Sequence, residues 1–263
     1  MTSNRFLAWC ATMGITDVCG DVVRCFCKRP IHKEEVESPL ESVKNQEFTA
    51  SPKTFFQEDI LSDKVQEMVA SCQNLQELYT HIPTVLKEFA PYKMAAHTLL
   101  GVGVEEKPNV MVISEKPCAE EDKKGELFCG PEGQLFRRML GAIGLSEQKQ
   151  TYVGMFFPWR TPGDRKLTPL EKKIGEILIR RQIALVQPKI LFLMGECPTE
   201  LVSSTPMLQL RGKKLVYQGE GQEIPARVSF SARMVFETPE LCRQKAWEDL
   251  LGLKALMETD ETL

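Results

Sequence analysis

The amino-acid sequence predicts an α/β domain of three layers, in which helices cover both faces of a central sheet of four parallel strands. Two observations predict this class. From residue 109 onward, short apolar runs of strand length alternate with longer segments of helical periodicity. The overall composition, with 43% hydrophobic and 26% charged residues, is that of an ordinary globular protein able to bury a sizeable core.

The predicted elements of this domain follow one another in a regular order. Periodicity supports the helices, since apolar residues at helical spacing form one stripe between residues 135 and 143. Such alternation of strands and helices implies parallel pairing with right-handed crossovers. We expect strands at residues 109–114, 151–157, 189–194 and 227–230, and helices at 132–143, 168–186, 198–202 and 239–257.

The part of the chain before the sheet divides into an extension and a helical segment. Residues 2–27 predict one or two short helices, whereas residues 28–59 contain three prolines and no apolar periodicity, which is typical of a linker. Further helices are expected at 64–72 and 75–79, and a third should begin at Pro83 and reach Phe89. We therefore expect a partly disordered extension and linker over 1–60, followed by the α/β domain over 61–258.

Charge and cysteine usage restrict the partners and the compartment. A net charge of −3 argues against a general polyanion binder, although eight basic residues concentrate between positions 160 and 189, either as a nucleic-acid surface or as a solvated helix face. Nine cysteines without regular spacing predict reduced thiols in a cytoplasmic protein. The apolar stretch 6–23 is interrupted by Asp17 and Asp21, so we expect neither a membrane span nor an export signal.

The strand at 109–114 leads into an acidic loop punctuated by glycine, at the end of the sheet where open parallel sheets bind ligands. This loop and the segments after it resemble the family-4 uracil-DNA glycosylases in order and spacing, over roughly residues 108–256. The segments that carry the resemblance are Glu115-Lys-Pro-Cys-Ala-Glu-Glu-Asp122, Gly125-Glu-Leu-Phe-Cys-Gly130, Gly133-Gln-Leu-Phe136, Arg160-Thr-Pro-Gly-Asp-Arg165, Pro188-Lys189 and Leu210-Arg-Gly212.

The resemblance implies particular roles in the excision of a flipped base. Glu115 would act near the attacking water, with Pro117 in the same loop, and Phe128 would stack on the base. Met155 stands where the family has the asparagine that reads uracil, and Ser231 stands where the family has the histidine that stabilises the departing base. A solvated carboxylate at Glu115 and core packing at Phe128 and Met155 are the plainer alternatives.

Two further expectations follow from the resemblance. Arg160, Arg165 and Arg211 would contact DNA phosphates, although plain surface turns explain these positions too. Family-4 enzymes also hold a four-cysteine iron–sulfur cluster, and the matching positions here carry no cysteine, with Trp159 and Gly175 at two of them and Tyr92 in the segment of the earlier ligands. We therefore expect no metal and no cofactor.

The sequence thus favours a uracil-DNA glycosylase-like protein of base-excision repair that acts on DNA, either single-stranded or uracil-containing. Met155 and Ser231 predict that cleavage of the N-glycosidic bond is impaired, because neither side chain supplies the hydrogen bonds of the residue it replaces. Two other functions stay open: a non-catalytic module that binds DNA or protein on the same fold, and a hydrolase acting on another base or nucleotide.

Overall fold

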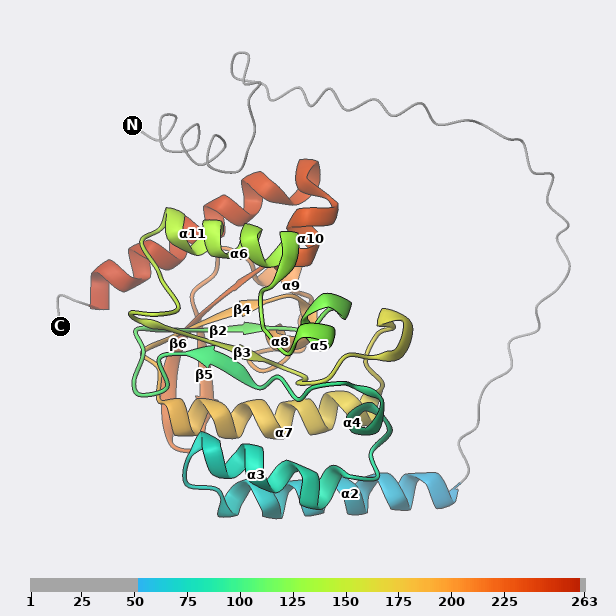
Figure 1. Cartoon of the computed structure of the whole chain (residues 1–263). Helices are drawn as coiled ribbons and strands as arrows, with labels where there is room; N and C mark the ends of the chain where they lie inside the picture. The colour runs from blue at the N-terminus through green and yellow to red at the C-terminus, as the bar shows by residue number, and fades with distance from the viewer. Residues whose placement is uncertain (1–51, 261–263) are drawn as a thin grey trace, which may run out of the picture. The chain divides into compact units, whose positions relative to one another are not determined.

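The computed structural model describes residues 52–260, and a mixed sheet lies at the centre of this part of the chain (Figure 1). The sheet has six strands in the order β1-β3-β2-β4-β6-β5 rather than the four expected. The central strands β3, β2, β4 and β6 pair in parallel, and the edge strands β1 and β5 pair antiparallel. The strands are β1 (Gly101–Gly103), β2 (Val110–Ser114), β3 (Thr151–Met155), β4 (Ile190–Met194), β5 (Leu215–Gly219) and β6 (Gln222–Ser229).

The two edge strands were missed because they lack a long apolar run. β1 has only three residues, and β5 alternates exposed and buried positions where it pairs with β6. Glu220 and Gly221 join β5 to β6, and both have positive φ, at 44° and 76°. This backbone is the one that a tight hairpin turn between antiparallel strands requires, and the sequence Glu-Gly is a weak signal for it.

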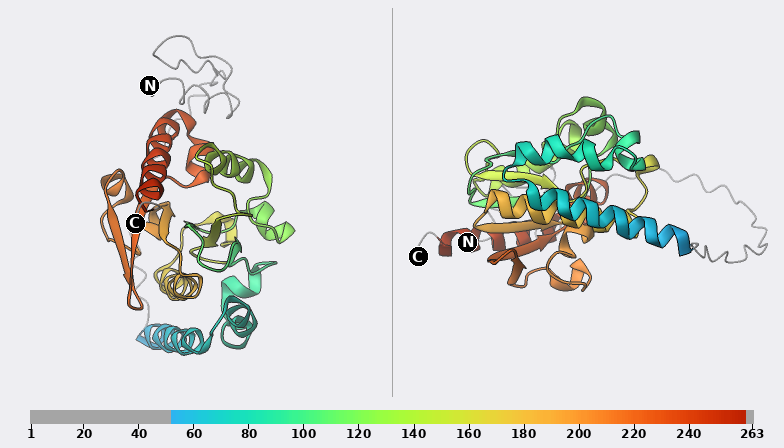
Figure 2. Two further views of the ribbon diagram at one scale, coloured as in Figure 1. Left: turned by 90° about the vertical axis from the view of Figure 1, so that its left-hand side faces the viewer. Right: turned by 90° about the horizontal axis from the view of Figure 1, so that it is seen from below.

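Helices cover both faces of the sheet (Figures 1 and 2). On one face lie α6, α10 and α11, whereas α7 packs on the other face and α3 lies beyond it. The helices are α2 (Pro52–Ser71), α3 (Leu75–Leu86), α4 (Ala90–Met94), α5 (Ala119–Lys124), α6 (Gly130–Ala142), α7 (Pro169–Val186), α8 (Glu196–Thr199), α9 (Met207–Leu210), α10 (Ala232–Glu237) and α11 (Pro239–Asp260), with a 3-10 turn at Pro162–Asp164.

The N-terminal helices differ from the expected ones in two places. α2 begins at Pro52, so the last residues of the expected linker 28–59 are helical. Pro83 lies inside α3 rather than at the start of a new helix, because α3 continues from Leu75 to Leu86. A compact unit begins at Leu61, and the expected helices of residues 2–27 and most of the expected linker lie outside the described residues.

The central strands form the core of the unit that begins at Leu61. In β2, residues Val110, Met111, Val112 and Ile113 are fully buried, and all five residues of β4 are buried as well. Strands covered on both faces by helices are apolar throughout because neither face meets water. Over residues 52–260, no helix combines the length and the hydropathy that crossing a membrane requires.

Candidate active site

A pocket lies at the carboxyl ends of the central strands, where the sequence predicts the site. Its residues come from the loops after β2 and β6, from the end of β3 and from the start of α6. The cavity measures about 70 Å³, which holds a few water molecules but is well below the roughly 300 Å³ of an ordinary small-molecule site. It is lined by Ser114, Glu115, Lys116, Cys118, Glu121, Phe128, Glu132, Gly133, Met155, Ser231, Ala232 and Arg233.

Glu115, directly after β2, is held against the start of α8. Its Oε1 accepts a hydrogen bond from the backbone N–H of Glu196 at 3.1 Å. Gly195 makes this approach possible, since a Cβ there would lie 2.6 Å from the Glu115 carboxyl carbon. Burial raises the pKa of Glu115, while hydrogen bonds from the backbone of Cys197 and Glu196 act in the opposite direction. A carboxylate with a raised pKa is a stronger base than an exposed one.

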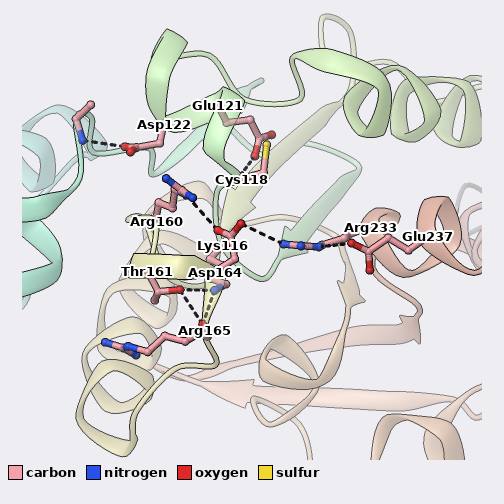
Figure 3. A network of polar contacts seen from close by, with 11 residues as sticks. Lys116, Cys118, Glu121, Asp122, Arg160, Thr161, Asp164, Arg165, Arg233 and Glu237 are labelled. Atoms are coloured by element: carbon pink, nitrogen blue, oxygen red, sulfur yellow. Dashed lines mark hydrogen bonds and ion pairs between the residues drawn. The ribbon is translucent and has the colours of Figure 1, made fainter. Parts of the chain in front are cut away.

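Lys116 joins the strand-end loop to the turn after β3 (Figure 3). Its Nζ donates to the Thr161 hydroxyl and, at 2.5 Å, to the backbone carbonyl of Arg165. Burial lowers the pKa of Lys116, although the nearby Asp164 carboxylate acts against this effect. The lysine therefore anchors the turn 160–165 beside the pocket, a role that its position in a loop did not reveal.

Phe128 is buried in the pocket wall and is fixed on two sides. Its ring stacks on Phe136, with ring centroids 4.1 Å apart and an interplanar angle of 18°. Its backbone N–H donates to Oε1 of the buried Glu121 at 2.6 Å, and the other carboxylate oxygen of Glu121 accepts from the N–H of Cys118 at 2.8 Å. Phe128 adopts φ of +56°, which is uncommon for a residue with a side chain. One ring face is therefore covered, while the residue still lines the cavity.

Met155 and Ser231 also line the pocket, and both are buried, at 1% and 4% exposure. Met155 ends β3, and Ser231 caps α10, its Oγ accepting from the N–H of Met234 at 3.3 Å. Capping uses a lone pair, so the hydroxyl proton of Ser231 stays available as a donor. Pro117 is buried but is absent from the residues that line the cavity.

Two charged residues of the pocket escaped the sequence reasoning. Arg233, in the first turn of α10, donates from Nε to Glu237 Oε1 at 2.8 Å, and its Nη1 lies 4.0 Å from Asp164 Oδ2 (Figure 3). Glu132, near the start of α6, has a pKa raised by burial and opposed by the charge of Arg233. Glu132 directly precedes the segment Gly133–Phe136, and Arg233 lies two residues after Ser231, so the sequence signal for both is their position beside a candidate site residue.

The three arginines expected to contact DNA all have carboxylate partners within the chain. Arg160 donates to Asp164 at 3.1 Å, and Arg165 makes two hydrogen bonds of 2.7 Å with Glu171. Arg211 makes two hydrogen bonds, of 2.7 and 3.0 Å, with the buried Asp249. Arg160 and Arg165 remain partly exposed beside the pocket, whereas Arg211 is 12% exposed and braces α11.

Aromatic side chains fill the space around Trp159, one of the positions where the resemblance places a cluster cysteine. Trp159 is fully buried and donates from Nε1 to the Thr98 hydroxyl at 2.9 Å. Its ring meets those of Phe89, Tyr92 and Phe157 edge to face at 5.2–6.0 Å. A Cβ on Gly175 would lie 2.8 Å from the carbonyl of Phe156. These residues do not fit an iron–sulfur cluster, and residues 52–260 hold no group of three potential metal ligands.

Comparison with known proteins finds similarity to uracil-DNA glycosylases. The family model of the uracil DNA glycosylase superfamily matches residues 100–251. Type-4 uracil-DNA glycosylase of Archaeoglobus fulgidus is 27% identical over 57% of this chain and 77% of its own length, and that of Sulfurisphaera tokodaii is 25% identical over 75% and 85%. The solved structure of Pedobacter heparinus SMUG2 is 14% identical, with a TM-score of 0.40 over 57% of this chain and 76% of that chain, too low a score to support the fold by itself.

Proposed function

We propose that this chain, which belongs to the uracil DNA glycosylase superfamily, acts in DNA base-excision repair by hydrolysing the N-glycosidic bond of a flipped base. The observation that carries the proposal is the meeting of Glu115 and Phe128 in one pocket at the ends of β2, β3 and β6. We further propose DNA, either single-stranded or uracil-containing, as the partner, and the cytoplasm as the compartment.

The chemistry follows from the placement of each group. Phe128 offers an aromatic face for the base, and such stacking contributes roughly 1–3 kcal/mol. Glu115, whose pKa is raised by burial, orients the attacking water and takes its proton as the bond from the sugar carbon to the base breaks. The electron pair of that bond leaves with the base. Ser231 donates one neutral hydrogen bond to the departing base.

We propose that this activity is impaired and has lost its selectivity for uracil. The Met155 thioether cannot both donate and accept along the edge of uracil, whereas sites built on such hydrogen bonds reject analogues by roughly 10⁴–10⁵. Losing a preorganised donor to a developing anion costs about 10²–10³ in rate, and one hydroxyl recovers only part of it. The cavity of about 70 Å³ must also widen before a base can enter.

We also propose that the protein works without an iron–sulfur cluster. The packing of Phe89, Tyr92 and Phe157 around the buried Trp159 supports this, because these four rings offer no thiolate to bind iron and supply apolar contacts in its place. The aromatic group joins the segment before β1 to the turn after β3.

Excision from single-stranded oligonucleotides containing uracil, hypoxanthine or xanthine tests the function. We expect uracil removal to be absent or severely reduced, and to rise when Met155→Asn, Ser231→His and Ala232→Pro are combined. Glu115→Ala should abolish whatever activity remains, whereas Glu120→Ala, an exposed glutamate of α5, should not. Rapid uracil removal by the unmodified protein that depends on Glu115 would refute the proposed impairment.

The second candidate is a non-catalytic DNA-binding module on the same fold. The small cavity and the nearly complete burial of Met155 favour it, because they leave little room for a base. A module of this kind should bind DNA with an affinity that falls steeply with salt, and should yield no abasic product. A protein-interaction module would show neither property.

A further inference from the structure

Two arginines from distant parts of the sequence converge on one carboxylate beside the pocket (Figure 3). Asp164 Oδ1 accepts from Arg160 Nε at 3.1 Å, and Asp164 Oδ2 lies 4.0 Å from Arg233 Nη1. We call Arg160, Asp164 and Arg233 the arginine clamp. Arg160 and Asp164 belong to the turn after β3, whereas Arg233 belongs to α10 and lines the cavity, so the clamp connects that turn to the cavity wall.

The clamp is open to solvent and lies near a third cation. The side chains of Arg160, Asp164 and Arg233 are 33%, 27% and 44% exposed, so a ligand from solution can reach them. Lys116 is close enough for the charges of Asp164 and Arg233 to act on its pKa in opposite directions. Three positive groups therefore lie around Asp164, and the carboxylates of Glu237 and Glu132 also act on Arg233.

We propose that the arginine clamp binds a backbone phosphate of the DNA strand whose base enters the pocket, and that Asp164 occupies the place of this phosphate in the free protein. The choice of DNA as the ligand rests on the proposed function. Guanidinium groups bind carboxylates and phosphates through the same planar pattern of donors, so a carboxylate held between two arginines stands in for a phosphate.

The remaining contacts of the clamp suit this exchange. Glu237 accepts from Nε of Arg233, and Nη1 of Arg233 lies on the side of Asp164, 4.0 Å from its Oδ2. Asp164 has φ of +54°, a left-handed backbone that aspartate and asparagine tolerate better than most residues. Asp164→Asn therefore removes the competing charge without straining the turn.

Binding of a fluorescent single-stranded oligonucleotide, measured by anisotropy at several salt concentrations, tests the clamp in the full chain. Asp164→Asn should tighten binding at least about fivefold, the factor that one unit charge about 4 Å away contributes in water. It should change the slope of log affinity against log salt by less than the roughly 0.7 that one phosphate contact on a single strand contributes, because the clamp binds the same phosphate in both proteins. Arg160→Gln and Arg233→Gln should weaken binding and flatten that slope.

Two control variants distinguish the effect of the clamp on DNA affinity from the effect of the protein's net charge. Glu88→Gln removes one negative charge from the exposed ion pair with Lys93 and is the control for Asp164→Asn. Arg180→Gln breaks the ion pair with Glu176 on α7 and is the control for Arg233→Gln, because both arginines pair with a glutamate four residues away. The proposal is wrong if Asp164→Asn tightens binding no more than Glu88→Gln, or if Arg233→Gln weakens it no more than Arg180→Gln.

Three further outcomes are decisive. Absence of DNA binding by every variant, Asp164→Asn included, would overturn the clamp as a phosphate site. Displacement of the oligonucleotide by millimolar inorganic phosphate at constant ionic strength would assign the site to free phosphate instead of a DNA strand. The expected binding pattern without excision of any base would support the clamp and overturn only the proposed hydrolysis.

Discussion

Replacing Arg211 by alanine is expected to destabilise the fold rather than to remove a DNA contact. Arg211 makes two hydrogen bonds with Asp249, whose side chain is only 3% exposed, and its guanidinium also lies 4.6 Å from the centre of the Phe230 ring. The alanine variant leaves Asp249 buried with Ser229 as its remaining hydrogen-bond donor. Breaking a buried ion pair in this way costs about 3–5 kcal/mol.

This loss is a large part of the roughly 5–15 kcal/mol that stabilises a typical domain. For a domain of this size, about 1 kcal/mol lowers Tm by about 2–4 °C, so the variant should melt about 6–20 °C below the wild type. Burial raises the pKa of Asp249, and hydrogen bonds from Arg211 and Ser229 act against burial, so removing Arg211 raises that pKa further.

The pH dependence of the Arg211→Ala effect follows from this change. A carboxyl with a raised pKa binds its proton more tightly in the folded state, so its contribution to stability falls as pH rises from about 4 through the folded pKa. The difference in Tm between variant and wild type should therefore be largest at neutral pH and should shrink toward pH 4.

Thermal and urea unfolding of both proteins measure the effect, with Arg160→Ala as the control. The Arg160 pair with Asp164 is partly exposed, so its loss should cost only about 0–1 kcal/mol. The reasoning would be refuted if Arg211→Ala melted within about 2 °C of the wild type at neutral pH, the smallest shift that 1 kcal/mol produces. Weakened DNA binding in such a stable variant would instead identify Arg211 as a DNA contact.

Three further predictions concern the thiols, the metal content and the packing of Trp159. Burial raises the pKa of Cys118 and of Cys197 to about 11, so at pH 8 each thiol should react with iodoacetamide about 100-fold more slowly than an ordinary cysteine with a pKa of about 9. Peptide mass spectrometry measures each rate, and equal rates for these and for denatured cysteines would contradict the assigned burial. Purified protein should contain no stoichiometric iron, and Trp159→Ala should cost about 3–5 kcal/mol in unfolding free energy. Iron found in equal amount to protein would mean that other cysteines bind a cluster.

Much of the fold could be predicted because its signals are local. The strand at Val110–Ser114 and the helix at Pro169–Val186 lie within one residue of their expected starts, since an apolar run and a capped periodic segment each identify an element by themselves. The edge strands β1 and β5 could not be predicted in the same way. β1 pairs with β3, which lies about 50 residues later in the sequence, and β5 pairs with β6 through a turn whose sequence signal is weak.

In the candidate site, too, the residues given by local motifs were predicted, whereas the roles that depend on distant partners were not. Glu115, Phe128, Met155 and Ser231 were named from motif positions, and the structure brings all four to one cavity. Pro117 belongs to the same loop but does not line the cavity, and nothing in the loop sequence indicates which way its side chain faces. The roles of Lys116 and Arg233 depend on partners 45 and more residues away, so no local pattern could reveal them.

The sequence by itself determined the fold class, the order of the central elements and the motif residues that meet in the pocket, because strand and helix periodicity and motif order are properties of consecutive residues. Only the tertiary structure decided how charge is distributed around that pocket. It placed Asp164 between Arg160 and Arg233, and it paired Arg211 with the buried Asp249. Whether an arginine faces a ligand or a carboxylate of its own chain depends on which distant segments the fold brings within a few ångströms of it.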